Sequence, residues 1–143
     1  MSYVFLDDVT LADVAFEARA SSLEELFEQS ALALTNSMVD DLSKIEQKVE
    51  ISVNLTSQTI EMLLYNFLQE LIFIKDTKKL LFSNFMIKIT KRDDEYELVA
   101  RLRGEEINQD KHKCRVDVKA VTMHRFEVKK EIDKWLARVI LDV

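Results

Sequence analysis

Two carboxylates stand among apolar neighbours, although they are far apart in the chain. Asp13 interrupts a mostly apolar stretch, and Asp142 follows the apolar run of residues 139–141 and stands beside the C-terminal carboxylate of Val143. A carboxylate in such surroundings is unfavourable unless it is paired or binds a cation. Two of them brought together would repel each other, and a divalent ion would remove the conflict. Oxygen ligands favour Ca²⁺ or Mg²⁺ over zinc. Periodicity alone also allows the plainer alternative that both acids are solvent-facing strand residues.

The signatures of nucleotide binding and of common hydrolases are missing. The chain has one glycine, Gly104, and no proline, whereas phosphate-cradling loops and the nucleophile elbow need several glycines. The histidines, His112 and His124, are far apart and form no paired ligand motif, and His124 is interpreted as structural. Cys114 is the single cysteine, which excludes an intrachain disulfide, and its place in an alternating segment predicts a packed thiol. No catalytic residue is predicted.

The composition is that of one ordinary domain spanning residues 1–143. Hydrophobic residues make up 48% and charged residues 32%, which excludes both a disordered and a membrane-embedded chain. No stretch approaches the roughly 20 apolar residues that cross a bilayer, and the first residues lack the basic region of a signal peptide. Together with the single cysteine, this predicts a reducing, cytoplasmic setting and no membrane partner.

The charge is unevenly distributed along the chain. The net charge is −6, but residues 1–76 carry 14 acids and 4 bases, while residues 101–143 carry 8 acids and 11 bases. An acidic protein repels nucleic acid, because affinity for RNA comes mainly from cations that neutralise phosphates. We therefore expect no stable direct binding of nucleic acid. The asymmetry can orient the protein against a charged partner.

Periodicity predicts the secondary structure. In the first half, strands are expected at 3–6, 12–19 and 49–55, a helix from Ser21-Ser22 to Met38, and a second helix, capped by Thr56 or Ser57, that runs to about Lys75. In the second half, a hairpin is expected at 81–103, a polar loop at 105–113, and strands at 114–121, 126–131 and 135–141. The fold class that follows is α+β: a single domain with a mainly antiparallel β-sheet and two amphipathic helices packed on one face.

Five segments in this order resemble the archease family. They are ADV (12–14) with SLEELF (22–27), LLFSNF (80–85), GE (104–105) with His112, VKAVTMH (118–124) and ARVILDV (137–143). The family's corresponding segments include LLFSEF, KAVTYH and ARVVLDV, and the resemblance covers nearly the whole chain. Two departures stand out. Met123 replaces the usual tyrosine, and the DHTADV opening of many archeases has no histidine here, so that Asp8 aligns with its first acid only if one residue is inserted.

The resemblance implies an archease-like fold and a metal-binding accessory protein that catalyses nothing itself. In the family this protein activates the RNA ligase that joins 3′-phosphate and 5′-hydroxyl ends in tRNA splicing, by promoting guanylylation and multiple turnover. By motif position, Asp13 and Asp142 match the metal-linked acids and Lys119 matches the lysine needed for ligase activation. Asp8 and Val143 are additional candidates at or near the metal. The cofactor implied is a divalent cation, calcium first, with magnesium or manganese as alternatives.

Two other functions remain open at the level of sequence. The first is a chaperone or modulator of RNA-modifying enzymes such as methyltransferases, with the unusually wide apolar stripe of the second helix as its contact surface. The second is a metal-dependent hydrolase that uses Asp13 and Asp142 with Lys119 as an electrophile. The hydrolase ranks last, because no convincing nucleophile or general base accompanies the acids.

Overall fold

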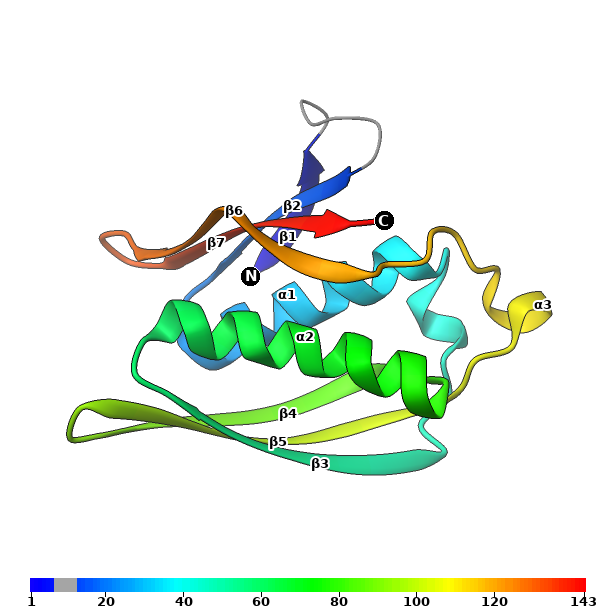
Figure 1. Cartoon of the computed structure of the whole chain (residues 1–143), viewed down its shortest axis with the longest axis horizontal. Coiled ribbons are helices and arrows are strands. Elements are labelled where there is room, and N and C mark those ends of the chain that lie inside the picture. The colour runs from blue at the N-terminus through cyan, green and yellow to red at the C-terminus, as the bar shows by residue number, and fades with distance from the viewer. Residues whose placement is uncertain (7–12) are drawn as a thin grey trace.

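The computed structural model describes residues 1–6 and 13–143. Two antiparallel sheets enclose a layer of two long helices (Figure 1). The four-stranded sheet has the order β1-β2-β7-β6, and the three-stranded sheet has the order β3-β5-β4. The strands are β1 (Ser2–Leu6), β2 (Asp13–Ala20), β3 (Val49–Ser57), β4 (Leu80–Arg92), β5 (Glu95–Glu106), β6 (Ala120–Lys130) and β7 (Trp135–Asp142).

The two long helices begin at side-chain caps. Helix α1 (Leu23–Met38) starts after Ser22, whose hydroxyl accepts the Glu25 N–H at 3.2 Å, as the sequence predicts. Helix α2 (Ile60–Lys78) starts after Thr59, whose hydroxyl accepts the Met62 N–H. The predicted cap at Thr56 or Ser57 is wrong, because β3 continues through Ser57 in register with β5. There are two short helices, η1 (Leu42–Lys44) and α3 (Gln109–His112), and α3 lies within the polar loop predicted at 105–113.

The core lies where the helices meet both sheets. The stacked rings of Phe27 and Phe67, with centroids 6.0 Å apart, join α1 to α2, and both side chains are completely buried. Each helix contacts strands of both sheets. The predicted α+β class, with mainly antiparallel strands and two amphipathic helices, is confirmed. The strands form two sheets, and each sheet packs one of its faces on the helices.

The chain between α3 and β6 is a strap rather than a strand. We call residues 113–119 the strap; apart from one bridge between Cys114 and Val39, it has no regular structure. The predicted strand at 114–121 is therefore wrong for most of its length, and β6 begins only at Ala120. The predicted strand at 126–131 is the second half of β6. Cys114 is exposed, so the packed thiol is also a wrong prediction.

The backbones of β4 and β5 approach each other closely at Gly104. A Cβ placed on Gly104 would lie 1.8 Å from the backbone oxygen of Leu81. Only a residue without a side chain fits there. None of the helices in the described parts of the chain is long and apolar enough to cross a membrane.

Candidate functional site

The two candidate acids face each other across neighbouring strands. In the antiparallel pair of β2 and β7, Asp13 lies directly opposite Asp142, and Asp142 in turn lies opposite Ala120 of β6. Directly opposed residues project from the same face of a sheet, with Cβ atoms about 4.5–5.5 Å apart. The strand register therefore brings together two carboxylates that come from opposite ends of the sequence.

The face of the four-stranded sheet that carries Asp13 and Asp142 is turned away from the helices. The adjacent row, Val14 opposite Leu141, belongs to the buried core, so the Asp13–Asp142 row must project outward. Asp13 is half-buried, and Asp142 is exposed. Like charges directly opposite each other destabilise a sheet. The register thus places two acids side by side on the outer face of the sheet.

The backbone of Lys119 is hydrogen-bonded to Asp142, one of the two candidate acids. Its N–H donates to the backbone oxygen of Asp142 at 2.8 Å, immediately before β6 begins. The Lys119 side chain is exposed, and it has no ion pair or hydrogen bond within residues 1–6 and 13–143. The three residues predicted as metal-linked or ligase-activating, Asp13, Asp142 and Lys119, are therefore neighbours.

The donor chemistry of the acid pair suits a hard divalent cation. Calcium is bound by about six to eight oxygen ligands at roughly 2.3–2.6 Å, and Asp13 and Asp142 would supply two carboxylates toward such a set. Within the described residues no third His, Cys, Asp or Glu joins them in a group. Of the additional candidates, Val143 packs its side chain against the core and leaves only its main-chain oxygens for a cation. Asp8 lies outside the described residues.

A cavity of about 220 Å³ adjoins Asp13. Its walls come from β1, β2, the end of α1 and the strap, and they include Arg115 together with Asp13. The Arg115 guanidinium donates to the backbone oxygen of Asn36 at 3.2 Å. Asp13 and Arg115 therefore both lie at the wall of this small cavity.

A second set of charged residues lies on the same outer face, four residue pairs along β2 and β7 from Asp13 and Asp142. Glu17, opposite Arg138, is 8% exposed. Its two carboxylate oxygens accept guanidinium N–H groups of Arg138 and Arg19, each at 2.7 Å. The hydrogen bond from Arg138 lowers the pKa of Glu17, with Arg19 contributing, against the opposing effect of burial. This ion-pair network was not predicted, although Glu17 and Arg19 stand on the same face of a recognisable strand.

The loop between β5 and the strap is held by a buried carboxylate. Glu105 accepts the Glu46 backbone N–H at 2.8 Å, the Lys111 ammonium at 2.8 Å and the His112 Nε2 at 3.0 Å. Because His112 Nδ1 accepts the Asn108 N–H, its proton resides on Nε2, which donates to Glu105. Burial acts to raise the pKa of Glu105, but these hydrogen bonds outweigh it and lower the pKa to about 2.

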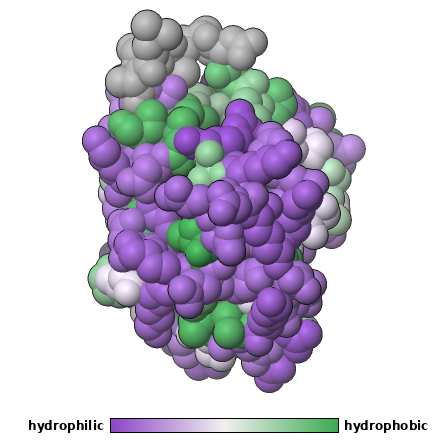
Figure 2. Space-filling model, turned by 90° about the vertical axis from the view of Figure 1, so that its right-hand side faces the viewer, coloured by the Kyte–Doolittle hydropathy of each residue, from purple (hydrophilic) through white to green (hydrophobic). Residues whose placement is uncertain are grey.

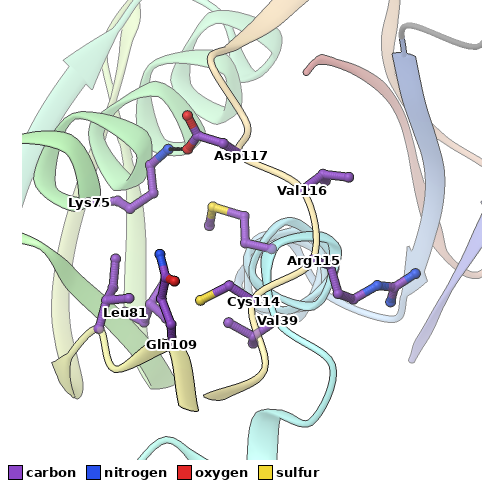
Figure 3. A pocket seen from close by; sticks show the side chains of 10 residues that line it. Val39, Lys75, Leu81, Gln109, Cys114, Arg115, Val116 and Asp117 are labelled. Atoms are coloured by element: carbon purple, nitrogen blue, oxygen red, sulfur yellow. Dashed lines mark hydrogen bonds and ion pairs between the residues drawn. The ribbon is translucent and has the colours of Figure 1, made fainter. Parts of the chain in front are cut away.

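A larger cavity, of about 540 Å³, opens beside the strap. Figure 3 shows Lys75 of α2 and Leu81 of β4 on one side, and Cys114, Arg115 and Asp117 of the strap on the other. A dashed line in the figure joins the Lys75 ammonium to Asp117. Nothing in the sequence pattern predicts this cavity, because the strap was interpreted as a strand.

Comparison with known proteins gives a consistent result. A family model described as the Archease protein family matches residues 3–143. The chain is 46% identical to "Protein archease" of Methanothermobacter thermautotrophicus over 136 residues, which is 95% of each protein. It is 37% identical to "Protein archease" of Pyrococcus furiosus over 133 residues, which is 92% of this chain and 93% of that protein.

Solved structures agree with the sequence matches. The solution structure of a Methanobacterium thermoautotrophicum protein has a TM-score of 0.87 at 44% identity and covers 99% of both chains. A crystal structure from Thermotoga maritima, described as an archease and possible chaperone, has a TM-score of 0.61 at 19% identity, over 94% of this chain and 93% of that one, and shows only the shared fold. On the family match and these identities, the chain belongs to the archease family.

Proposed function

We propose that this archease activates an RNA ligase that joins 3′-phosphate and 5′-hydroxyl ends in tRNA splicing. It promotes guanylylation of the ligase, in which GMP is transferred from GTP and pyrophosphate leaves, and it supports repeated turnover. One observation carries the proposal: Asp13 and Asp142 lie in register on β2 and β7, and Lys119 is tied to Asp142 through its backbone. These are the residues that the family's motifs mark for the function.

Each residue has a distinct role in the proposal. Asp13 and Asp142 hold a divalent cation, with calcium favoured over magnesium or manganese because the ligands are flexible carboxylates. When bound, the cation supplies positive charge that can contact phosphate oxygens. Lys119 supplies a second positive charge from the adjacent backbone position. The archease itself forms no covalent bond with nucleotide or RNA.

The partner is the ligase rather than its RNA. The archease carries a net charge of −6, which suits association with a basic, RNA-binding enzyme and disfavours binding to RNA directly. Activation then requires only that the archease binds the reactive ligase conformation more tightly than the resting one. A differential affinity of about tenfold corresponds to about 1.4 kcal/mol, which shifts the populations of the two conformations tenfold.

The test is a ligation assay with the cognate ligase, GTP and a divalent ion, under single and multiple turnover. The wild-type protein is expected to raise both guanylylation and turnover. Asp13→Asn and Asp142→Asn are expected to lower this stimulation at least about tenfold, comparable to the loss of a metal ligand or its close support. No stimulation by the wild-type protein would refute the proposed function.

The matched control is Asp133→Asn, which removes the same charge from the exposed turn between β6 and β7. It is expected to stimulate the ligase like the wild type. Calcium titration of the isolated proteins by calorimetry adds a direct measure of the site. Unchanged calcium affinity in both Asp13→Asn and Asp142→Asn would contradict the cation site, whatever the ligation assay gives.

The fold weakens the chaperone alternative. The apolar stripe of α2 that would be its contact surface is enclosed between the sheets, with Leu63, Leu64 and Phe67 completely buried. Of the apolar residues that widen the stripe, Phe73 is 58% and Met62 38% exposed. Figure 2 shows that the face at the α3 end of the molecule is largely hydrophilic, with small, separate hydrophobic patches. Suppression of aggregation of unrelated proteins would revive this alternative.

A further inference from the structure

The ammonium group of Lys75 is buried and hydrogen-bonded to the strap. The residue is 6% exposed, and its Nζ lies 2.6 Å from Asp117 Oδ1, 2.7 Å from the Val118 carbonyl oxygen and 2.9 Å from Asp76 Oδ1. The ammonium donates hydrogen bonds to Asp117 and to the Val118 carbonyl, and Asp76 adds an ion pair. Burial of an unpaired charge is strongly unfavourable, so the ammonium holds these acceptors in place.

Both hydrogen-bond acceptors of the Lys75 ammonium belong to the strap. The strap is anchored at its start by backbone hydrogen bonds from Arg115 to Met38 and from Asp40 to Lys113. The 540 Å³ cavity lies along one side of residues 114–117 (Figure 3). At the end of this stretch, Asp117 accepts a hydrogen bond from the Lys75 ammonium.

A single peptide unit links Lys75 to the candidate site. The Val118 carbonyl, which accepts from Lys75 at 2.7 Å, and the Lys119 N–H, which donates to Asp142 at 2.8 Å, are the two ends of one peptide group. Because that group is planar and rigid, fixing its oxygen also fixes the direction of its N–H. A charge-assisted bond at the oxygen also polarises the group and strengthens the bond at the N–H.

The same helix holds the chain on the other side of Lys119. The backbone N–H of Val121 donates to the Gln69 side-chain oxygen at 2.8 Å. Gln69 and Lys75 both belong to α2, so polar side chains of one helix bracket Lys119. Val118 and Val121, which flank it in the sequence, are almost completely buried.

We propose that Lys75 is a positioning residue for the Lys119–Asp142 pair: from α2 it orients the Val118–Lys119 peptide and so places Lys119 beside the acid pair. Lys75 contacts neither a cation nor the ligase. The link between Lys75 and ligase activation rests on the proposed function. The effect of Lys75 on the orientation of the Val118–Lys119 peptide does not. A residue that only stabilised the core would affect the whole molecule equally.

The experiment is amide hydrogen exchange, followed by NMR, on Lys75→Met. The loss of a charge-assisted hydrogen bond is expected to speed exchange at the Lys119 amide by about tenfold or more. Exchange at Leu98, in the middle of β5, is expected to change much less. The control Lys78→Met, an exposed lysine of the same helix, is expected to leave both amides unchanged. Unchanged exchange at Lys119, or equal acceleration at Lys119 and Leu98, would overturn the proposal.

A measurement on the wild-type protein covers the case in which Lys75→Met fails to fold. The Lys75 ammonium hydrogens are expected to give a distinct NMR signal that exchanges with water far more slowly than that of Lys78. Equal exchange rates for the two ammonium groups would contradict the proposal. The ligation assay is separate from both measurements. Failure of the wild type to activate would refute the proposed function, and the exchange data would still decide the positioning role.

Discussion

Glu105→Gln gives a quantitative test of the buried carboxylate that holds the β5–α3 loop. The carboxylate accepts from the Glu46 backbone, Lys111 and His112. Glutamine has one acceptor oxygen, which can keep the bonds from Glu46 and His112, but its NH₂ group must then face the Lys111 ammonium. One charge-assisted bond is lost and two are weakened, so we expect the free energy of unfolding to fall by about 2–3 kcal/mol at pH 7.

The pH dependence of this difference follows from the lowered pKa of Glu105. In the unfolded chain the carboxyl has its ordinary pKa of 4.5, and in the folded protein the pKa is about 2. A lowered pKa stabilises the fold fully above the unfolded value, and the contribution is lost as the pH falls through the folded value. The difference between wild type and variant should therefore be constant above about pH 5.5 and shrink between pH 4.5 and about pH 2.

The assay is urea denaturation followed by circular dichroism at a series of pH values. Glu106→Gln is the matched control, because its neighbouring carboxylate is exposed, and it should change stability by less than about 0.5 kcal/mol. Equal effects of the two substitutions at pH 7 would refute the reasoning. So would a Glu105→Gln difference that stays constant down to pH 2.5.

Three further substitutions test the fold and the outer face of the four-stranded sheet. Gly104→Ala should destabilise by about 3 kcal/mol or more in thermal denaturation, because its Cβ would meet the Leu81 backbone. Ser22→Ala removes the cap of α1 and should lower the unfolding free energy by about 1 kcal/mol in urea denaturation, with helix content unchanged. Glu17→Gln leaves Arg19 and Arg138 without their shared carboxylate. It should destabilise by about 1–2 kcal/mol at pH 7 and by less on acidification, since the pKa of Glu17 is lowered in the fold.

Local patterns predict the individual elements well but not their partners. The alternation around Asp13 and the stripe of α1 correctly predict a strand and a helix, because side-chain direction depends only on local geometry. Which strands pair is determined by contacts between distant segments. Periodicity therefore could not predict that the strands divide into two sheets on either side of the helices.

The strap illustrates how a local pattern can mislead. Cys114, Val116 and Val118 alternate with polar residues as a strand would, yet within residues 1–6 and 13–143 they form only one bridge, between Cys114 and Val39. Lys75 was overlooked for a related reason, since a lysine near a helix end normally indicates the solvent-facing side. Its burial depends on acceptors in a segment that was assigned the wrong structure.

The residues of the candidate site come from two kinds of sequence evidence. Two carboxylates among apolar neighbours raised the possibility of a cation site, but only the family resemblance selected Lys119. The register that sets Asp13 opposite Asp142 and ties Lys119 to it comes from the structure alone. Asp8 and the binding of a metal stay predictions.

The position of β7 has a consequence for how the protein is made. This strand follows the other strands in the chain, yet it lies inside the four-stranded sheet, between β2 and β6. Pairings between distant segments form slowly, because a long loop must close first. Until β7 has been synthesised and inserted, the β1–β2 hairpin and β6 share no partner, and Asp13 has no acid opposite it. A ligase whose activation requires the acid pair would therefore not be activated by nascent or partly folded copies of the protein, but only by the fully folded one.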